Sequence, residues 1–186
     1  SPGDLSTIAY TSGTTGHPKG AMQSHEAVIL NGSMMSQLHM RGSDDTVVSA
    51  LPCPHVYANV LMTGMMMFGT KLILHKTFDV DEVFASIKSY KATIFDGVPT
   101  MYMFMLNSPY IKNADLSSLK RCYVGGQTMP VATMTAVEKE FKVPLIELWG
   151  MTEIAGLGAT FPLFGPNKHG SIGCAIPYCE LKIADV

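Results

Sequence analysis

The segment between residues 10 and 20 has the composition of a loop that binds a polyphosphate. Its residues are Tyr10, Thr11, Ser12, Gly13, Thr14, Thr15, Gly16, His17, Pro18, Lys19 and Gly20. The glycines let the backbone approach a ligand closely, and successive backbone N–H groups can form a concave site for an anion. The hydroxyl groups add hydrogen-bond donors, and the lysine adds a mobile positive charge. The segment therefore predicts a site for the phosphates of a nucleotide.

The same segment differs from the phosphate loop of ordinary ATPases. In that motif a second glycine comes five residues after the first and is followed by lysine and then by serine or threonine. Here Pro18 stands five residues after Gly13, and Gly20 follows Lys19. The sequence thus favours a nucleotide site of another class.

Two further segments place unusual residues where a strand is expected to end. Gly125 and Gly126, followed by Gln127, permit close contact with a flat group such as a purine, although an ordinary strand-to-helix turn explains them equally well. The second segment consists of Trp149, Gly150, Met151, Thr152 and Glu153. Its indole could stack on a base, its threonine could bind phosphate, and its carboxylate could bind Mg²⁺ as a hard oxygen ligand. A tryptophan beside a glycine is also common in protein cores.

The composition excludes several other classes of protein. The 186 residues are 47% hydrophobic and 15% charged, and their net charge is -2. This is enough apolar material for a packed core, and it offers no basic surface for nucleic acid, so we expect no nucleic-acid partner. The most apolar run, 60–68, is too short to span a bilayer, which predicts no integral membrane segment.

The cysteines have no spacing that suggests a metal site. They are Cys53, Cys122, Cys174 and Cys179. No pair has the CxxC spacing, and no histidine completes a metal-binding pattern. Reduced thiols in a cytoplasmic protein are the interpretation that this pattern favours.

Strand and helix patterns alternate along the chain and predict a layered α/β fold. Strands are expected at 5–10, 46–51, 71–75, 93–95, 121–124 and 145–148. Helices are expected at 24–38, 58–68, 79–90, 99–107 and 130–141. Ser24 suits the N-cap of the first helix, and the helix at 79–90 has apolar residues at spacings of three and four. Loops that follow strands are the usual ligand sites of such folds, and each segment described above follows a predicted strand.

Together, the three segments resemble the signature motifs of the adenylate-forming, or AMP-binding, superfamily. That superfamily includes acyl-CoA synthetases, peptide-synthetase adenylation domains and beetle luciferases. The order and separation of the motifs agree with the family pattern, and the resemblance extends from Asp4 to Asp185. It implies that residues 1–186 form a partial AMP-binding domain, the core part of the large domain of such an enzyme.

The resemblance implies a role for each matching position in the nucleotide site. The loop from Thr11 to Lys19 would cover the β- and γ-phosphates of ATP, with Lys19 as a partner of the leaving phosphates. Thr14 and Glu153 would bind Mg²⁺. Thr152 would contact the α-phosphate.

The adenine and acyl positions follow from the same resemblance. Trp149 and the strand end at Gly125, Gly126 and Gln127 would enclose the adenine, with Gly150 and Met151 beside the nucleotide. The segment from Pro52 to Tyr57 resembles the one whose histidine lies between the acyl carboxylate and the nucleotide. His55 would therefore orient the carboxylate, although a histidine satisfied by its neighbours in a turn is the alternative.

The acyl pocket would be lined by Val56, Tyr57 and Gly150. Acetate-specific members of the family carry a tryptophan at the position of Gly150, so glycine would leave the pocket open. No lysine or arginine lies in the segments expected to line it, and a second carboxylate on the substrate would stay unpaired. These features predict a medium-chain or aromatic monocarboxylic acid, and neither acetate nor malonate.

The chain also departs from the family pattern. Gln127 replaces a residue that is usually small, and Glu147 with Leu148 stands where many members have Gln-Gly or Asp-Gly. The ribose-binding aspartate, the hinge and the C-terminal lid with its catalytic lysine have no counterpart here. The N-terminal part of the large domain is also expected to be absent.

The implied activity is ATP-dependent formation of acyl-AMP followed by thioesterification to coenzyme A, as in an acyl-CoA ligase. Two alternatives remain. A peptide-synthetase adenylation domain would usually have an acid that holds the substrate amine shortly after His55, and residues 56–61 contain none. An isolated nucleotide-binding fragment without turnover is the other alternative.

Overall fold

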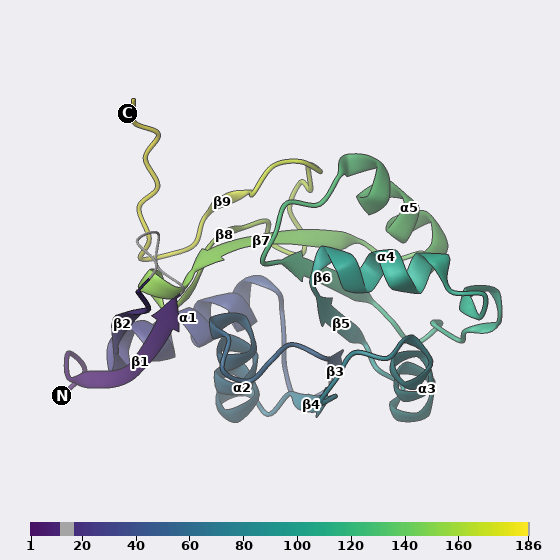
Figure 1. The fold of residues 1–186 in the computed structure, drawn as a ribbon, viewed down its shortest axis with the longest axis horizontal. Coiled ribbons are helices and arrows are strands. Elements are labelled where there is room, and N and C mark those ends of the chain that lie inside the picture. Colours follow the sequence, from purple (N-terminus) through teal and green to yellow (C-terminus); the bar gives the residue numbers. More distant parts are fainter. Residues whose placement is uncertain (12–16, 186) are drawn as a thin grey trace.

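The computed structural model describes residues 1–11 and 17–185, and within them a seven-stranded sheet runs through the centre of the molecule (Figure 1). Its strands lie in the order β4, β3, β5, β6, β7, β8 and β9. Their bounds are β3 Thr46–Ser49, β4 Lys71–Leu74, β5 Ile94–Gly97, β6 Arg121–Gly125, β7 Leu145–Met151, β8 Gly156–Thr160 and β9 Cys174–Ala175. The alternation of strands with helices confirms the predicted α/β fold.

The direction of the strands changes across the sheet. β4, β3, β5, β6 and β7 are parallel, whereas β8 and β9 join in the antiparallel sense. Because β3 lies between β4 and β5, the chain leaves β3 in one direction and returns past it to form β5. In open α/β sheets the carboxyl ends of strands at such a reversal form the crevice where ligands bind. The topology therefore points to the carboxyl ends of β3 and its neighbours as the site.

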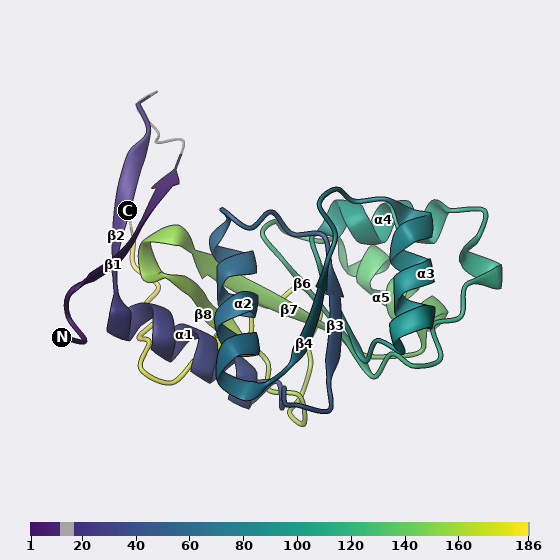
Figure 2. The ribbon, with the colours of Figure 1, turned by 90° about the horizontal axis from the view of Figure 1, so that it is seen from below.

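Helices cover both faces of the sheet, and Figure 2 shows them on its two sides. The first face carries α1 (His25–Leu38) and α2 (Val56–Phe68). The second face carries α3 (Val80–Tyr90), α4 (Pro99–Asn107) and α5 (Val131–Phe141). Successive strand residues point to opposite faces, so Val47 joins one core and Val48 the other. Burial on both faces explains why these strands are rich in apolar residues, and the polar residues that they contain, such as Asp96 and Arg121, are buried in ion pairs.

Local signals set the ends of several helices. The hydroxyl of Ser24 accepts a hydrogen bond from the backbone N–H of Ala27, which confirms the predicted start of α1. The carboxylate of Asp79 accepts two backbone N–H groups in the first turn of α3. Gly69 ends α2 in the left-handed conformation with φ 71°, which glycine adopts without steric strain.

A separate antiparallel pair, β1 (Leu5–Thr11) and β2 (Lys19–Ser24), lies beside α1 near the N-terminus (Figure 1). The sequence predicts β1 but not β2, because residues 19–24 contain none of the β-branched or aromatic residues that favour strands. Pairing with β1 sets the conformation of β2. The glycine- and hydroxyl-rich segment therefore connects two paired strands and does not lead directly into a helix.

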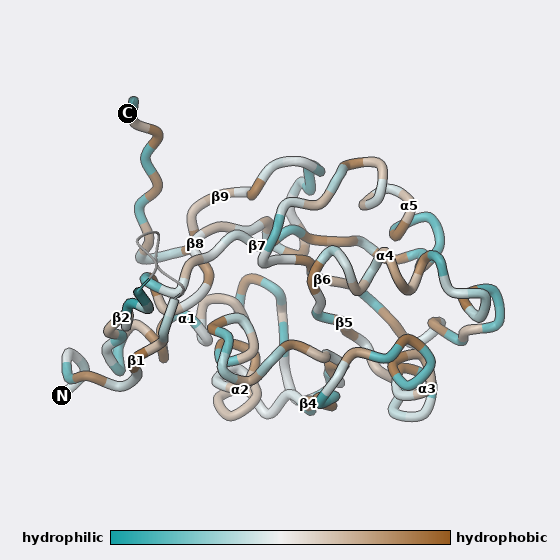
Figure 3. Tube along the Cα trace, in the orientation of Figure 1, coloured by the Kyte–Doolittle hydropathy of each residue, from teal (hydrophilic) through white to brown (hydrophobic). Residues whose placement is uncertain are grey.

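Buried side chains form two apolar clusters, one on each face of the sheet. Figure 3 shows apolar segments in the interior and hydrophilic ones in outer connections such as the one that follows α4. Among the helices of the described residues, none has the length and apolar character needed to cross a membrane. The four cysteines are free thiols.

Candidate functional site

A cavity of about 50 Å³ opens at the carboxyl ends of the central strands, where the topology points. Part of its wall consists of residues that the sequence singled out: His55, Val56, Tyr57, Gly125, Gly126 and Gly150. The rest of the wall comes from residues that the motifs do not reveal: Met35, Val60, Leu148, Gly156 and Leu157. The fold thus brings the predicted acyl segment and the predicted strand-end glycines into one largely apolar cavity.

The glycine turn after β6 has two distinct backbone requirements. A β-carbon on Gly125 would lie 3.1 Å from both the β-carbon and the carbonyl oxygen of Leu148, so little room exists for a side chain. Gly126 has φ 86°, a conformation that residues with a side chain rarely adopt. Both the close approach of a flat ligand and an ordinary tight turn fit this geometry.

Gly150 lies in β7 opposite Leu157, where the register of the β7–β8 pair shifts. A β-carbon on Gly150 would collide with the carbonyl oxygen of Gly156, which itself has φ 141°. A tryptophan introduced at position 150 would therefore meet the backbone of β8 before it could fill the cavity. In this backbone the substitution would break the strand pair, so another residue must test the size of the cavity.

His55 has a structural role and a place in the cavity at the same time. Its Nδ1 accepts a hydrogen bond of 3.1 Å from the backbone N–H of Tyr57 and so caps α2. Because Nδ1 accepts, the neutral ring carries its proton on Nε2. The ring is exposed and lines the cavity. Its Nε2–H is therefore a donor that suits a carboxylate in the cavity.

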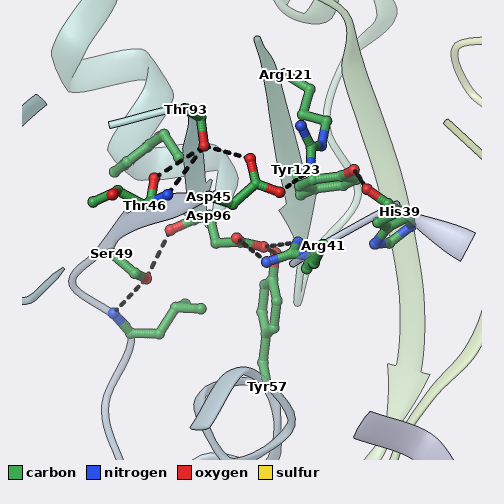
Figure 4. A network of polar contacts seen from close by, with 12 residues as sticks. His39, Arg41, Asp45, Thr46, Ser49, Tyr57, Thr93, Asp96, Arg121 and Tyr123 are labelled. Carbon is green, nitrogen blue, oxygen red and sulfur yellow. Dashed lines mark hydrogen bonds and ion pairs between the residues drawn. The ribbon is translucent and has the colours of Figure 1, made fainter. Parts of the chain in front are cut away.

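Tyr57 connects the cavity to a buried ion pair (Figure 4). Its hydroxyl donates to Oδ1 of Asp96 at 3.0 Å, and Arg41 donates two hydrogen bonds to the same carboxylate at 2.7 and 3.0 Å. Burial raises the pKa of Tyr57 well above its ordinary value, and the negative charge of Asp96 adds to this effect. Burial opposes the charge of Arg41, but Asp96 keeps the pKa of the guanidinium above its usual value. The phenol is thus a neutral donor fixed in the cavity wall.

A second buried ion pair lies beside the first. Arg121 donates to Asp45 at 2.7 Å, and the hydroxyl of Thr93 donates to the same carboxylate at 2.6 Å. Burial alone would raise the pKa of Asp45, but the hydrogen bonds from Thr93 and Arg121 hold it below its ordinary value. His39 stacks on Tyr123 with ring centres 4.1 Å apart, and burial, helped by the two arginines, lowers its pKa so that the ring is neutral. These charges neutralise one another and do not line the cavity.

Thr152 and Glu153 begin a 3₁₀ turn, η2 (Thr152–Ile154), which directly follows β7. β7 continues to Met151, three residues beyond the predicted strand end, because it pairs with β8. Glu153 is exposed and forms no hydrogen bond or ion pair with any residue that the structure describes.

The next question is which of the described side chains could bind the predicted Mg²⁺. Within 1–11 and 17–185, no group of three or more histidine, cysteine or acidic side chains could hold a metal ion. Mg²⁺ at nucleotide sites is usually bound by one or two carboxylates together with substrate phosphates. The single exposed carboxylate of Glu153 fits a metal ion of that kind.

Trp149 is half-buried in β7, and its indole packs over Gly158 of β8. It lines a cavity of about 420 Å³ between α1 and residues 176–181. The turn at Gly125 and Gly126 lines the other cavity, on the neighbouring strand. The described geometry does not bring the indole and this turn into one cavity, and an adenine site between them stays a prediction.

The predicted phosphate loop is described only at its ends. Thr11 and Lys19 face each other across the end of the β1–β2 pair, and Lys19 is exposed. The intervening positions Ser12, Gly13, Thr14, Thr15 and Gly16 lie outside the described residues. Gln127 is exposed after the glycine turn. Because η2 packs against both β1 and β2, the ends of the loop and the turn of Thr152 and Glu153 lie on neighbouring elements.

Two buried amide side chains near this turn were not recognised from the sequence. Gln23 contacts Thr152 of η2, and Asn31 contacts Leu157 of β8, each more than 120 residues away along the chain. No local pattern marks Gln23. Asn31 is marked weakly, because it is polar at the apolar spacing of α1, three residues after Val28 and four before Met35.

The fold is that of a known class of enzyme. A family model described as "AMP-binding enzyme" matches residues 1–186 of this chain. The chain therefore belongs to the family of AMP-binding enzymes, as the resemblance of its motifs predicts.

Particular relatives within the family are CoA ligases. The chain is 33% identical over 183 residues to a long-chain-fatty-acid–CoA ligase of Bacillus subtilis (strain 168), covering 97% of this chain and 33% of that protein. It is 36% identical over 178 residues to an indoleacetate–CoA ligase of Aromatoleum aromaticum, covering 95% of this chain and 35% of that protein. The crystal structure of ATP-bound MatB from Rhodopseudomonas palustris has a TM-score of 0.85 at 28% identity, covering 95% of this chain and 35% of that chain. The chain thus spans about a third of the length of these relatives.

Proposed function

We propose that the full-length protein containing this chain activates a carboxylic acid with ATP and transfers the acyl group to coenzyme A. A carboxylate oxygen would attack the α-phosphorus, and the bond from that phosphorus to the bridging oxygen would break. This step yields acyl-AMP and pyrophosphate. The thiol sulfur of coenzyme A would then attack the acyl carbon, displacing AMP, while the thiol proton passes to water. Family membership and the similarity to CoA ligases support this reaction.

One observation carries the proposal. The wall of the apolar cavity and the predicted phosphate-contacting turn are adjacent along the chain, because Gly150 of β7 lies in the wall and η2 begins two residues later at Thr152. An acid whose carbon chain occupies the cavity would therefore present its carboxylate beside the turn. Reactions of this kind require positioning and stabilisation of phosphoryl charge, and they do not require a covalent nucleophile on the protein.

Each contact with the substrates is assigned to a side chain that has the required chemistry. His55 would orient the carboxylate through Nε2–H, and the Thr152 hydroxyl would donate to the α-phosphate. Lys19, exposed where the loop ends, would pair with the leaving phosphates. Trp149 and Gly125–Gly126 would contact the adenine. Mg²⁺, for which Thr14 and Glu153 are the proposed ligands, supplies charge neutralisation on the phosphates when bound.

The proposed substrate is a medium-chain or aromatic monocarboxylic acid. Among the described residues that line the cavity there is no lysine or arginine, and the hydroxyl of Tyr57 is already bonded to Asp96. A second carboxylate would therefore be buried without a partner, which is strongly unfavourable. Acids longer than a few carbons require movement of the wall, and Met35 has the flexible side chain that permits it.

A pyrophosphate-exchange assay on the full-length protein tests the proposal. Acetate, butyrate, hexanoate, benzoate and malonate are compared as substrates for carboxylate-dependent exchange of labelled pyrophosphate into ATP. Activity should rise about fourfold per added methylene until the cavity is full, since each buried methylene contributes about 0.8 kcal/mol. A preference for acetate or malonate would contradict the assigned substrate class.

A substitution in the cavity wall tests the same point. Val60→Phe should move the preference toward shorter acids, because the larger ring would occupy the cavity. The matched control is Met66→Phe on the same helix, where the side chain is exposed and should leave the preference unchanged.

Two other functions are separated by the same assay. The isolated 186-residue chain spans about a third of its relatives, so it is a candidate for nucleotide binding without turnover. Calorimetric binding of MgATP without exchange by that chain would support this alternative. A peptide-synthetase activity is disfavoured because residues 56–61 contain no acid that could hold a substrate amine, and Asp96, which accepts from the hydroxyl of Tyr57 behind the cavity wall, is neutralised by Arg41. Exchange that depends on amino acids alone would reverse that judgement.

A further inference from the structure

Two amide side chains, one in β2 and one in α1, contact the backbone at the turn after β7 and at the start of β8. The Nε2 group of Gln23, in β2, donates to the backbone carbonyl oxygen of Thr152 at 2.7 Å. Asn31, in α1, makes two hydrogen bonds of 2.8 Å with the backbone of Leu157: its Nδ2 donates to the carbonyl, and its Oδ1 accepts from the N–H. The two amides thus contact the first residue of η2 and the second residue of β8.

Both contacts are buried and specific in geometry. Gln23 and Asn31 are each only 4% exposed. The carbonyl of Thr152 also accepts from the backbone N–H of Ala155, so it is fixed from within the turn and from outside it. Gly156 leaves room for the Asn31 amide, because a β-carbon there would collide with Oδ1 of Asn31. Such an arrangement holds the backbone of residues 152–157 in one position.

One short segment of the chain carries Lys19 of the proposed nucleotide site together with both amides. β2 begins at Lys19, and Gln23 follows four residues later, paired with Thr7 of β1. Ser24 then caps α1, the helix that carries Asn31. Movement of the β1–β2 pair would therefore be transmitted through the amides to the turn that begins at Thr152.

We propose that Gln23 and Asn31 are positioning residues that fix the turn of Thr152 and Glu153 relative to the strand ends at Thr11 and Lys19. This inference rests on the proposed function, in which these groups contact the phosphates. Neither amide needs to touch the substrate. Their effect would arise because phosphate contacts from two distant segments must be correct simultaneously, and a displacement of about 1 Å can lower a rate about 100-fold.

The test uses Gln23→Met in the full-length protein, because methionine keeps the length and volume of the side chain but removes the donor. We expect the maximal rate of pyrophosphate exchange per folded molecule to fall roughly 10- to 100-fold, with little change in the KM for the carboxylic acid. The concentration of Mg²⁺ that gives half-maximal rate should rise. The matched control is Gln37→Met on α1, whose amide is exposed and donates to the hydroxyl of Ser33 at 2.9 Å.

A second pair of variants tests Asn31. Asn31→Asp replaces the donor to the Leu157 carbonyl by a second acceptor and should lower the exchange rate in the same way. Its control is Asn107→Asp, where an exposed amide donates to the carbonyl of Met103.

A double-mutant cycle separates positioning from a general loss of structure. If Gln23 acts through the turn, Gln23→Met should lower the rate less than twofold in a protein that already carries Glu153→Ala, because residues that act as a unit are not additive. Full additivity would overturn the inference. So would a Gln23→Met protein that has a lower melting temperature and yet the same rate per folded molecule as the Gln37→Met control.

Failure of the proposed function would be recognised separately. If the unaltered protein catalyses no exchange with any acid, the proposed function is wrong, and the positioning role is decided by the dissociation constant for MgATP. A constant at least tenfold higher in Gln23→Met than in Gln37→Met would support the role. Equal constants would reject it.

Discussion

Two regions of the molecule use charge in opposite ways. In the middle of the sheet, Arg41 pairs with Asp96 and Arg121 pairs with Asp45, and all four side chains are at least nine-tenths buried. Outside this interior, Lys19 at the start of β2 and Glu153 after β7 are exposed, and Glu153 has no partner among the described residues.

The difference separates charges that specify the fold from charges that remain for a ligand. A buried ion pair contributes little net stability, but loss of one partner leaves an uncompensated charge in the interior. An exposed charge can be removed with almost no effect on folding. Tyr57 joins the two regions, since its ring lines the cavity while its hydroxyl is bonded to Asp96. Substitutions in each region should therefore affect different measurements.

The largest effect is expected from Asp96→Asn. The amide can still accept from Tyr57, but it leaves the charge of Arg41 buried without a counter-charge, which should lower the free energy of unfolding by about 3–5 kcal/mol. Denaturant unfolding of the full-length protein measures this change. Asp44→Asn, at an exposed site nearby, should change it little. Similar unfolding midpoints for the two variants would remove the distinction between the regions.

Glu153→Ala should lower the activity and leave the stability unchanged. Loss of the proposed metal ligand should lower the rate of carboxylate-dependent pyrophosphate exchange at least about 100-fold, since metal ions at phosphoryl groups contribute several kcal/mol. The unfolding midpoint should stay unchanged because the side chain is exposed. Glu140→Ala, also exposed, is the control. An unchanged rate in Glu153→Ala would exclude this carboxylate as a metal ligand.

Trp149 is half-buried, so it belongs neither to the buried ion pairs nor to the exposed charges. If the indole stacks on adenine, Trp149→Ala should raise the KM for ATP about tenfold, as expected for stacking worth about 1–3 kcal/mol. Trp149→Tyr should have a smaller effect. Steady-state kinetics with varied ATP gives both values. If alanine lowers the melting temperature and leaves the KM for ATP unchanged, the indole serves packing alone.

The smallest effect concerns Glu147, which is buried in β7 with Oε2 lacking a hydrogen-bond partner among the described residues. Burial raises its pKa above the ordinary value of 4.5. The protonated form therefore favours the folded state, and this contribution is full below pH 4.5 and is lost as the pH rises through the folded-state pKa.

The free energy of unfolding, measured between pH 4 and pH 7, tests the direction of this pH dependence. Glu147→Gln should gain stability relative to the unaltered protein as the pH rises, because glutamine stays neutral. Glu140→Gln is the control, and its free energy of unfolding relative to the unaltered protein should not rise with pH. A relative gain toward acid pH would mean that the folded state favours the ionised carboxylate.

The sequence predicts the repeating part of the fold well because its signals are local. The Ser24 cap and the apolar spacing of α3 each act within one or two turns of helix. β2 and β8 escape prediction because residues 19–24 and the glycine-rich segment 156–160 have low strand propensity and depend on their partners.

The site is predictable only where a motif marks it. The motifs indicate His55 and Glu153, but the pairing of Arg41 with Asp96 joins residues 55 positions apart, and composition does not specify such pairs. The wall residues Met35 and Leu157 are ordinary apolar residues in the sequence. Only the fold places them around a cavity.

The contacts of Gln23 and Asn31 also have a consequence for the order in which parts of the protein become structured during synthesis. The hydrogen-bonded partners are 129 and 126 positions apart. On a ribosome that adds about 5–20 residues per second, the first strand pair would therefore emerge on the order of ten seconds before the turn that it contacts. Until then two amides, which are buried in the finished protein, have only water as a partner. The β1–β2 pair should consequently become resistant to protease late, after residue 157 has left the ribosome.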